Sequence, residues 1–302
     1  MPRSDQNELP LVIYDCFTDK RFGGNVGGVV LNAGALETEQ MQKIAREINA
    51  AVTGFVTNQN GNEVSVRFFM PGAEIAMCGH VTVGLFSHLA KEGPSNSAIS
   101  NYVMKAPAGD VQVSVDASDN SPPNVMMQLS VPTQIPCSVD VAALAAALGV
   151  PERDIGSRAA VEVADAGLKH LFVHFETLAE VEALAPDFQA LTDVSNENGV
   201  QTIACFSMET AEASNTLHIR DFCPAVGVDE VPASGTTNGA LAGYLLRHAF
   251  IPNKSQRILA EQGAEIGRPS LVRCEIDVQD RQIKTLRVGG QAVASIKGIL
   301  TV

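Results

Sequence analysis

The chain has 302 residues, of which 45 % are hydrophobic, so it is long enough for two packed domains. Its 34 acidic residues outnumber its 21 lysines and arginines, which gives a net charge of −13. A nucleic-acid partner is disfavoured because few basic groups are available to replace the counterions of a phosphate backbone. An anionic membrane surface is disfavoured on the same ground.

The N-terminal residues and the cysteines indicate where the protein is located and in which redox state. The first ten residues are polar and lack the apolar stretch of a secretory signal, and no apolar run is long enough to span a membrane. The six cysteines are scattered and form no C-x-x-C pair. This pattern is typical of reduced thiols rather than a disulfide framework or zinc site, so we expect a cytoplasmic protein without a metal.

Hydrophobic periodicity and turn residues predict short strands interrupted by a few helices. Strands are expected over residues 11–17, 27–31, 55–57 and 64–69, with helices over 39–50, 79–91 and 139–148. Residues 104–136 are again strand-like and contain a loop at 116–123. Because strands and helices do not alternate regularly, an α+β fold is favoured over a doubly wound sheet. The predicted domains are 1–132 and 133–302, with the last strand free to pack on the first domain.

An internal repeat suggests that the two domains are related. Arg67 to Pro71 and Arg220 to Pro224 share the pattern R-x-F-x-P. Each is followed by a small residue and a glycine that open an apolar helix, Cys78-Gly79 in the first half and Ser234-Gly235 in the second. The same order of elements in both halves predicts two similar domains, whose helix N-termini we expect to face one cleft.

These two helix starts are the candidate site. A helix N-terminus has free N–H groups and partial positive charge, so it binds a carboxylate, and glycine allows close approach. A thiol placed there is expected to have a lowered pKa and to act as a base, which makes Cys78 the candidate catalytic residue. The alternative for Cys78 is a small buried core residue. Ser234 is either a second catalytic group or a simple N-cap.

The histidines give one further candidate and no metal site. His80 lies one residue inside its helix, where it either contacts ligand or is satisfied by a nearby carbonyl. His170 and His174 are four apart but fall on a predicted strand, so they do not share a helical face. The glycine-rich run from Gly23 to Gly28 lacks the order and the following helix of a dinucleotide-binding loop.

Several motifs together resemble one family, the phenazine-biosynthesis-like (PhzF-like) isomerases. The resemblance extends over about residues 11 to 300. It is carried by Phe22-Gly-Gly-Asn25, Ala45-Arg-Glu-Ile-Asn49, Cys78-Gly-His80, Pro232-Ala-Ser-Gly-Thr-Thr-Asn-Gly-Ala-Leu241, Glu261-Gln-Gly263, Gly267-Arg-Pro-Ser270 and Val288-Gly-Gly-Gln-Ala-Val293. It implies a diaminopimelate-epimerase-like fold of two pseudo-symmetric α+β domains. Each domain would be a curled, mostly antiparallel sheet around a central helix.

The resemblance also implies a homodimer and cofactor-free proton transfer on a small carboxylic acid. The residues that would bind the substrate are Asn25, Gly79, His80, Gly235 and Thr236. Both acid–base carboxylates of the phenazine isomerase are missing, because its glutamate falls on Val52 and its aspartate on Val231. Cys78 and Ser234 stand where diaminopimelate epimerases and proline racemases carry their two cysteines.

Three functions follow from this pattern. The first is an isomerase or epimerase that moves a proton next to the carboxylate of an amino, imino or hydroxy acid, with Cys78 as base and Ser234 assisting. The second is a small-acid-binding protein that has lost catalysis together with its carboxylates at Val52 and Val231. The third is a dehydratase of a hydroxylated amino acid.

Overall fold

The computed structural model describes residues 8–92, 98–119 and 121–302. Most of the polar N-terminal stretch and position 120 of the predicted loop lie outside these ranges. The chain divides into two compact units, one formed by Met1–Met127 with Gly289–Val302 and the other by Gln128–Val288. The division thus falls five residues before the predicted boundary at 132/133, and the last strand belongs to the first unit.

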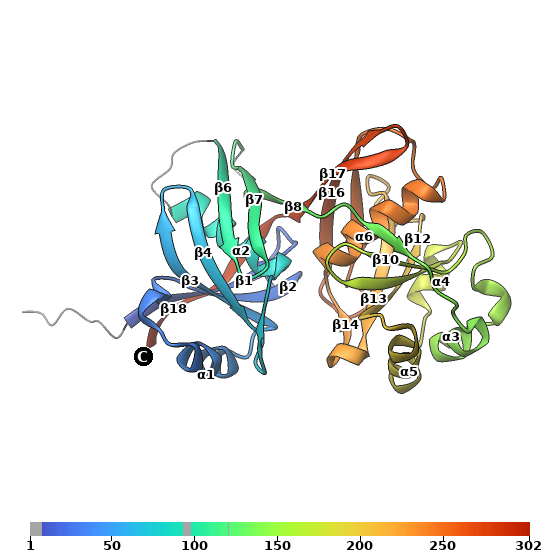
Figure 1. Cartoon of the computed structure of the whole chain (residues 1–302), viewed down its shortest axis with the longest axis horizontal. Helices are drawn as coiled ribbons and strands as arrows, with labels where there is room; N and C mark the ends of the chain where they lie inside the picture. Colours follow the sequence, from blue (N-terminus) through green and yellow to red (C-terminus); the bar gives the residue numbers. More distant parts are fainter. Residues whose placement is uncertain (1–7, 93–97, 120) are drawn as a thin grey trace, which may run out of the picture. The chain divides into compact units, whose positions relative to one another are not determined.

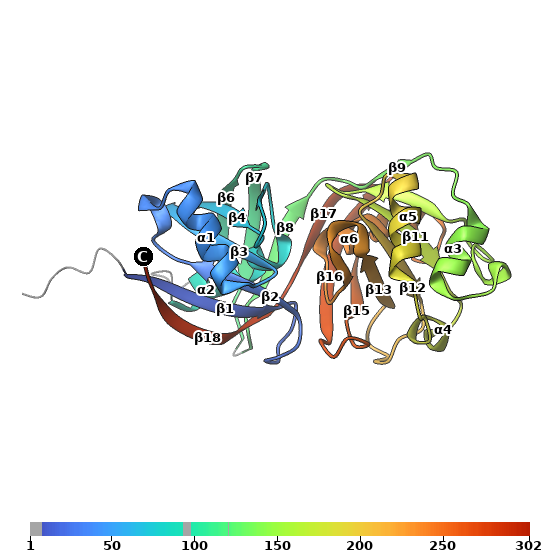
Figure 2. The ribbon, with the colours of Figure 1, turned by 90° about the horizontal axis from the view of Figure 1, so that it is seen from below.

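In its described residues, the first unit is a mixed sheet with the helices α1 and α2 (Figure 1). Its elements are β1 (Glu8–Cys16), β2 (Asn25–Val30), α1 (Thr38–Ile48), β3 (Val52–Asn60), β4 (Glu63–Phe69), β5 (Glu74–Ile75), α2 (Gly79–Glu92), β6 (Ile99–Ala106), β7 (Gly109–Asp116) and β18 (Ala292–Thr301). The strands pair in the order β18-β1-β2-β3-β4-β6-β7, and β5 also pairs with β4. Only β2–β3 and β4–β6 are parallel among these pairs. Figure 2 shows β18 beside β1.

The sheet of the first unit curls around α2. This helix packs against β18 at one end of the strand order and against β7 near the other. Its residues 81–89 are all buried, on every side of the helix. A helix that is apolar all round is a central helix, so the core of this unit forms around α2.

The second unit has the same plan. Its elements are β9 (Thr133–Ile135), α3 (Val141–Leu148), β10 (Glu162–Asp165), β11 (Lys169–His174), α4 (Leu178–Glu182), α5 (Phe188–Asn198), β12 (Thr202–Ser207), β13 (Leu217–Cys223), β14 (Val228–Val231), α6 (Gly235–Arg247), β15 (Gln256–Gln262) and β16 (Ser270–Gln279). The strand order is β9-β10-β11-β12-β13-β15-β16, with β14 also on β13. Helix α6 packs against β9 and β16, so this sheet also curls around its helix. The chain passes between the units within β8 (Asn124–Leu129) and β17 (Gln282–Gly290).

The predicted duplication is visible in the strand directions. The series β2-α1-β3-β4-β5-α2-β6-β7 recurs as β11-α5-β12-β13-β14-α6-β15-β16. In both series the first two strands are parallel, the next pairs are antiparallel, and the strand after the central helix returns parallel to the third strand. The α+β class predicted from the sequence is therefore confirmed.

Each copy also carries the same ion pair on its R-x-F-x-P strand. Arg67 donates from Nε and Nη2 to the two oxygens of Glu74, at 2.8 and 2.7 Å. Arg220 donates in the same way to Glu230, at 3.0 and 2.8 Å. In each copy the guanidinium also lies over the ring of the phenylalanine two residues on. The arginine of the repeat thus ties the strand to its short antiparallel neighbour, β5 or β14, which leads to the central helix.

Candidate active site

Cys78 and His80 meet at the start of α2. The Cys78 Sγ lies 3.3 Å from the His80 Nδ1. Strand β2 approaches this helix start closely, because a Cβ at Gly27 would lie 3.0 Å from a methyl carbon of Val81 and 3.3 Å from the His80 ring. The absence of a side chain at Gly27 therefore leaves room for the His80 imidazole between β2 and the Cys78 thiol.

The sulfur of Cys78 lies close to both ring nitrogens of His80, 3.3 Å from Nδ1 and 3.8 Å from Nε2. The backbone of Val26 acts to raise the pKa of His80, against the effect of burial. A neutral imidazole has one nitrogen that accepts a proton. The pair therefore places the thiol within reach of a group that can accept its proton.

The expected low pKa of Cys78 is wrong. Burial raises the pKa of the thiol to about 12, although the backbone N–H groups of His80 and Val81 act to lower it. The residue is 6 % exposed, and the cost of placing a thiolate there exceeds the stabilisation from the helix N-terminus. Burial also lowers the pKa of His80 to about 4. At neutral pH the pair is therefore a thiol beside a neutral imidazole.

Ser234 is the N-cap of α6. Its Oγ accepts from the backbone N–H of Thr237 at 3.2 Å, which is the capping interaction that the sequence left as an alternative. The hydroxyls of Thr236 and Thr237 lie 3.3 and 2.8 Å from the same oxygen. Cys78 occupies the equivalent place on α2, where the N–H of Val81, three residues on, acts on its sulfur. The repeat therefore places a thiol in one copy where the other has a hydroxyl.

The other predicted site residues fall around these two positions. Gly79 and Gly235 are the first residues of α2 and α6, and Thr236 is the second residue of α6. Asn25 is buried as the first residue of β2, two residues before the Gly27 that lies against the His80 ring. Each unit thus brings its own candidates together at one helix start.

The positions of the missing carboxylates are also defined. Val52 is buried as the first residue of β3, and Val231 is half-buried at the end of β14.

A cavity of about 520 Å³ in the first unit is lined by residues such as Asn32 and His88 and by none of the predicted site residues. It is separate from the Cys78–His80 pair.

Sequence reasoning gave no role to the Glu261-Gln-Gly263 motif, which supports the start of α6. The Gln262 amide accepts from Asn238 at 3.0 Å and donates to the Val231 carbonyl at 3.0 Å. Gly263 has φ +79°, and a Cβ there would lie 2.6 Å from the carbonyl oxygen of Pro232. The motif therefore fixes the turn that presents Ser234, and its conformation requires glycine.

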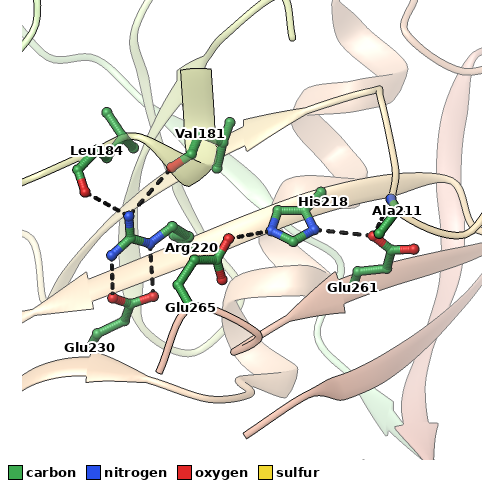
Figure 3. Close-up of polar contacts among 8 residues, drawn as sticks. All are labelled: Val181, Leu184, Ala211, His218, Arg220, Glu230, Glu261 and Glu265. Carbon is green, nitrogen blue, oxygen red and sulfur yellow. Dashed lines mark hydrogen bonds and ion pairs between the residues drawn. The ribbon is translucent and has the colours of Figure 1, made fainter. Parts of the chain in front are cut away.

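Glu261 anchors a second feature that the sequence did not reveal, a buried charge cluster (Figure 3). The ring nitrogens of His218 lie 3.1 Å from Glu261 and 2.6 Å from Glu265. Burial acts to lower the pKa of His218, but its hydrogen bonds to the two carboxylates outweigh burial and raise it. Glu261 also accepts from the backbone N–H groups of Ala211 and Glu212. The cluster ties the loop after β12 to β13 and β15.

The described residues include no helix that is long and apolar enough to cross a membrane.

Comparison with known proteins gives the family. The family model for "phenazine biosynthesis-like protein" matches residues 14–298. The chain is 32 % identical to the trans-2,3-dihydro-3-hydroxyanthranilate isomerase of Pseudomonas aeruginosa, over 95 % of this chain and 97 % of that one. It is 30 % identical to an uncharacterized isomerase of Salmonella typhimurium, YddE, over 92 % and 94 % of the two chains.

A solved structure supports the fold. The phenazine biosynthesis protein of the PhzF family from Bacillus anthracis superposes with a TM-score of 0.89 at 24 % identity, covering 98 % of this chain and all of that one. The family match, the relatives named as isomerases and the duplicated α+β units lead to one conclusion: this chain belongs to the phenazine-biosynthesis-like (PhzF-like) family and is an isomerase.

Proposed function

We propose that this isomerase moves a proton next to the carboxylate of a small amino, imino or hydroxy acid without a cofactor, and that Cys78 acts as the base through His80. The observation that carries the proposal is the 3.3 Å contact between the Cys78 Sγ and the His80 Nδ1. A buried thiol whose pKa is raised to about 12 needs a partner that takes its proton during the reaction. His80 is neutral and in hydrogen-bonding distance, so it is that partner.

The proton movements balance within this pair. As the S–H proton of Cys78 moves to the Nδ1 of His80, the sulfur takes the proton from the carbon beside the substrate carboxylate. The electron pair of that C–H bond is left on the substrate, conjugated with the carboxylate. Return of a proton to the other face gives epimerisation, and return to another carbon gives a double-bond shift. In this proposal Ser234, with Thr236 beside it, exchanges the second proton.

The substrate carboxylate is assigned to the N–H groups at the helix starts, at Gly79 and Gly235. Among the described residues, the nearest atoms to a Cβ at Gly79 would be those of Met127 at 3.7 Å, an ordinary contact. Asn25 is proposed as a further substrate-binding residue, and a homodimer as the assembly. The substrate of the Pseudomonas relative is not transferred, since the carboxylates missing at Val52 and Val231 leave that route without its acid–base groups.

One experiment separates the candidate functions. The purified protein is incubated in deuterated water with a panel of small amino, imino and hydroxy acids, and each acid is followed by mass. We expect one class to gain a solvent deuteron. No deuteron on any acid, together with a raised melting temperature for some, would contradict the proposal. The high pKa of the thiol and the two valines would then favour the small-acid-binding protein, whereas loss of water would identify the dehydratase.

A further inference from the structure

A buried carboxylate lies behind Ser234, and it is fully enclosed. Asp221 on β13 is 0 % exposed, and its Oδ2 accepts from the Thr237 hydroxyl at 2.6 Å. The same hydroxyl lies 2.8 Å from the Ser234 Oγ. These contacts form an unbroken chain from the carboxylate, through one threonine, to the half-buried serine at the start of α6.

We propose that Asp221 and Thr237 form a proton relay to Ser234, so that the proton which Ser234 exchanges with the substrate is stored on Asp221. This proposal rests on the role given to Ser234 above. Thr237 and Asp221 act through Ser234, so both are positioning residues and neither touches the substrate.

The Thr237 hydroxyl is the donor to both neighbours, Asp221 Oδ2 and Ser234 Oγ, and its one proton serves one of them at a time. When Asp221 is ionised, Thr237 donates to Oδ2, and in the relay the Ser234 hydroxyl then turns to donate to the Thr237 oxygen 2.8 Å away. When Asp221 carries the proton, its O–H donates to Thr237, and Thr237 donates to Ser234. In the second state Ser234 turns its own proton outward, toward the Thr236 hydroxyl or a substrate. The backbone N–H of Thr237 holds the Ser234 oxygen in place in both states.

The chemistry of one transfer is balanced. The C–H bond beside the substrate carboxylate breaks as the Ser234 oxygen takes its proton, while the serine proton passes to Thr237 and the threonine proton to Asp221. The negative charge moves from the Asp221 carboxylate to the substrate. The reverse sequence returns a proton to carbon.

The surroundings of Asp221 favour a carboxyl group that both holds and releases a proton. Burial raises its pKa to about 6, against the lowering effect of hydrogen bonds from Thr237 and Thr202. Its Oδ1 has no hydrogen-bond partner in the described part of the chain, which costs less for a neutral carboxyl than for a carboxylate. Titratable groups that also face Asp221 or its hydroxyl partners are Glu230, His170, Cys205 and Cys223.

Among these neighbours, Glu230 raises the pKa of Asp221 by its charge, but Glu230 is paired with Arg220. Burial lowers the pKa of His170 to about 3, so this histidine is neutral and its Nδ1 faces the hydroxyls of Thr202 and Thr237. Burial raises the pKa of both cysteine thiols, which stay protonated. Neither His170 nor the two cysteines changes charge near the pKa of Asp221.

The strand register adds an independent argument. Asp221 on β13 lies directly opposite Val231 on β14. Opposite residues in an antiparallel pair project from the same face of the sheet. The resemblance expects an aspartate at position 231. In this chain the carboxylate of Asp221 lies on the same face of the sheet, on the neighbouring strand, and accepts a hydrogen bond from Thr237 in α6.

The first test needs no substrate. The protein is labelled with carbon-13 at aspartate carboxyl groups, and the Asp221 signal is identified by its loss in Asp221→Asn. We expect its titration midpoint to lie well above the usual aspartate value and to rise further in Thr237→Val, which removes a donor but keeps the shape. Thr237→Ser should leave it unchanged, and Ser234→Ala should shift it. The relay would be overturned by a midpoint in the usual aspartate range, or by a midpoint that is the same in the wild type, in Thr237→Val and in Ser234→Ala.

The second test uses the acid found by deuterium incorporation. In the wild type and in Thr237→Ser, the rate of incorporation should change with pH around the midpoint measured by NMR. Thr237→Val should lose this dependence and fall about 10²-fold or more in rate. A slower variant that keeps the same pH profile would contradict the relay and leave Thr237 a structural role. If no acid exchanges at all, the proposed function fails, while the NMR titration still decides whether Asp221 is coupled to Ser234.

Discussion

At the scale of single residues, the environment of Cys78 decides what its chemistry is. Two effects compete at the sulfur: the N–H groups of a helix N-terminus favour the thiolate, and burial disfavours it. Burial prevails because Cys78 is only 6 % exposed, and water is the better solvent for a charge. In the proposed mechanism the thiol therefore depends on His80, whose Nδ1 lies 3.3 Å from the sulfur.

This balance predicts the order in which the thiols react with iodoacetamide. Cys137 is exposed, whereas Cys78 is buried and its pKa is raised. Alkylation requires an accessible thiolate. At neutral pH we expect Cys137 to be modified first and Cys78 to remain unmodified until the protein is unfolded, as measured by mass spectrometry of peptides. Equal rates at the two cysteines would show that Cys78 is a resting thiolate.

The sequence predicts the two helix starts at which these residues lie, but not the protonation of their side chains. Cys78, His80, Ser234 and Thr236 were recognised because a helix start with glycine has a local signature, and the structure places both helix starts as predicted. The relay partner Asp221 was not recognised, because its contact with Thr237 depends on how β13 packs on α6. The high pKa of Cys78 likewise comes from burial in the folded chain, which the local pattern does not show.

At the scale of elements, each copy of the repeat has its own arginine–glutamate ion pair, and the two pairs differ in how far they are buried. Arg220 and Glu230 are buried, with side chains 8 % and 4 % exposed, whereas those of Arg67 and Glu74 are 29 % and 32 % exposed. Arg220 also donates to the carbonyl of Leu184, so its strand is joined to the segment after α4. Loss of one partner is therefore expected to cost the second unit more than the first.

A pair of matched variants measures this difference. Glu230→Gln leaves the buried Arg220 charge without its counter-ion, and we expect it to lower the free energy of unfolding by about 3–5 kcal/mol. Glu74→Gln removes the equivalent carboxylate in the first unit and should cost about 0–1 kcal/mol, because water screens this pair. Urea denaturation of both variants gives the comparison. Equal losses would mean that the two pairs are equally buried in solution.

The elements of the first half were largely predictable from the sequence. The expected strand 64–69 and helix 79–91 differ from β4 and α2 by one residue at an end, since turn residues and periodicity mark them locally. Turn residues and periodicity do not predict which strands pair with each other. The contact between His218 and Glu261, for example, exists because β13 and β15 are parallel neighbours although many residues separate them.

At the scale of the whole molecule, the buried charge cluster of Figure 3 couples stability to pH. The pKa of His218 is raised, so its contribution is complete below the unfolded value of 6.5 and is lost as the pH rises through the folded value. The pKa of Glu261 and of Glu265 is lowered by their hydrogen bonds, although burial opposes this. Their contribution is present above the unfolded value of 4.5 and is lost as the pH falls through the folded values.

The variant His218→Gln tests this linkage. It keeps a polar side chain between the two carboxylates but has no positive charge. We expect the stability difference between wild type and variant to be largest between about pH 4.5 and 6.5, and to shrink at higher pH, measured from melting temperatures over a pH series. The matching substitution His174→Gln, at a buried histidine whose pKa is lowered, should not show this window. A constant difference at all pH values would contradict a charged His218.

The central claim is that the proton of the isomerase reaction passes through the Cys78–His80 pair, and the most direct measurement is deuterium incorporation by matched variants. With the acid that exchanges in deuterated water, Cys78→Ala should lose incorporation, and His80→Gln should slow it about 10²-fold or more. Val52→Ala, at the position of the missing glutamate, should exchange like the wild type. Incorporation at the wild-type rate in Cys78→Ala would contradict the account.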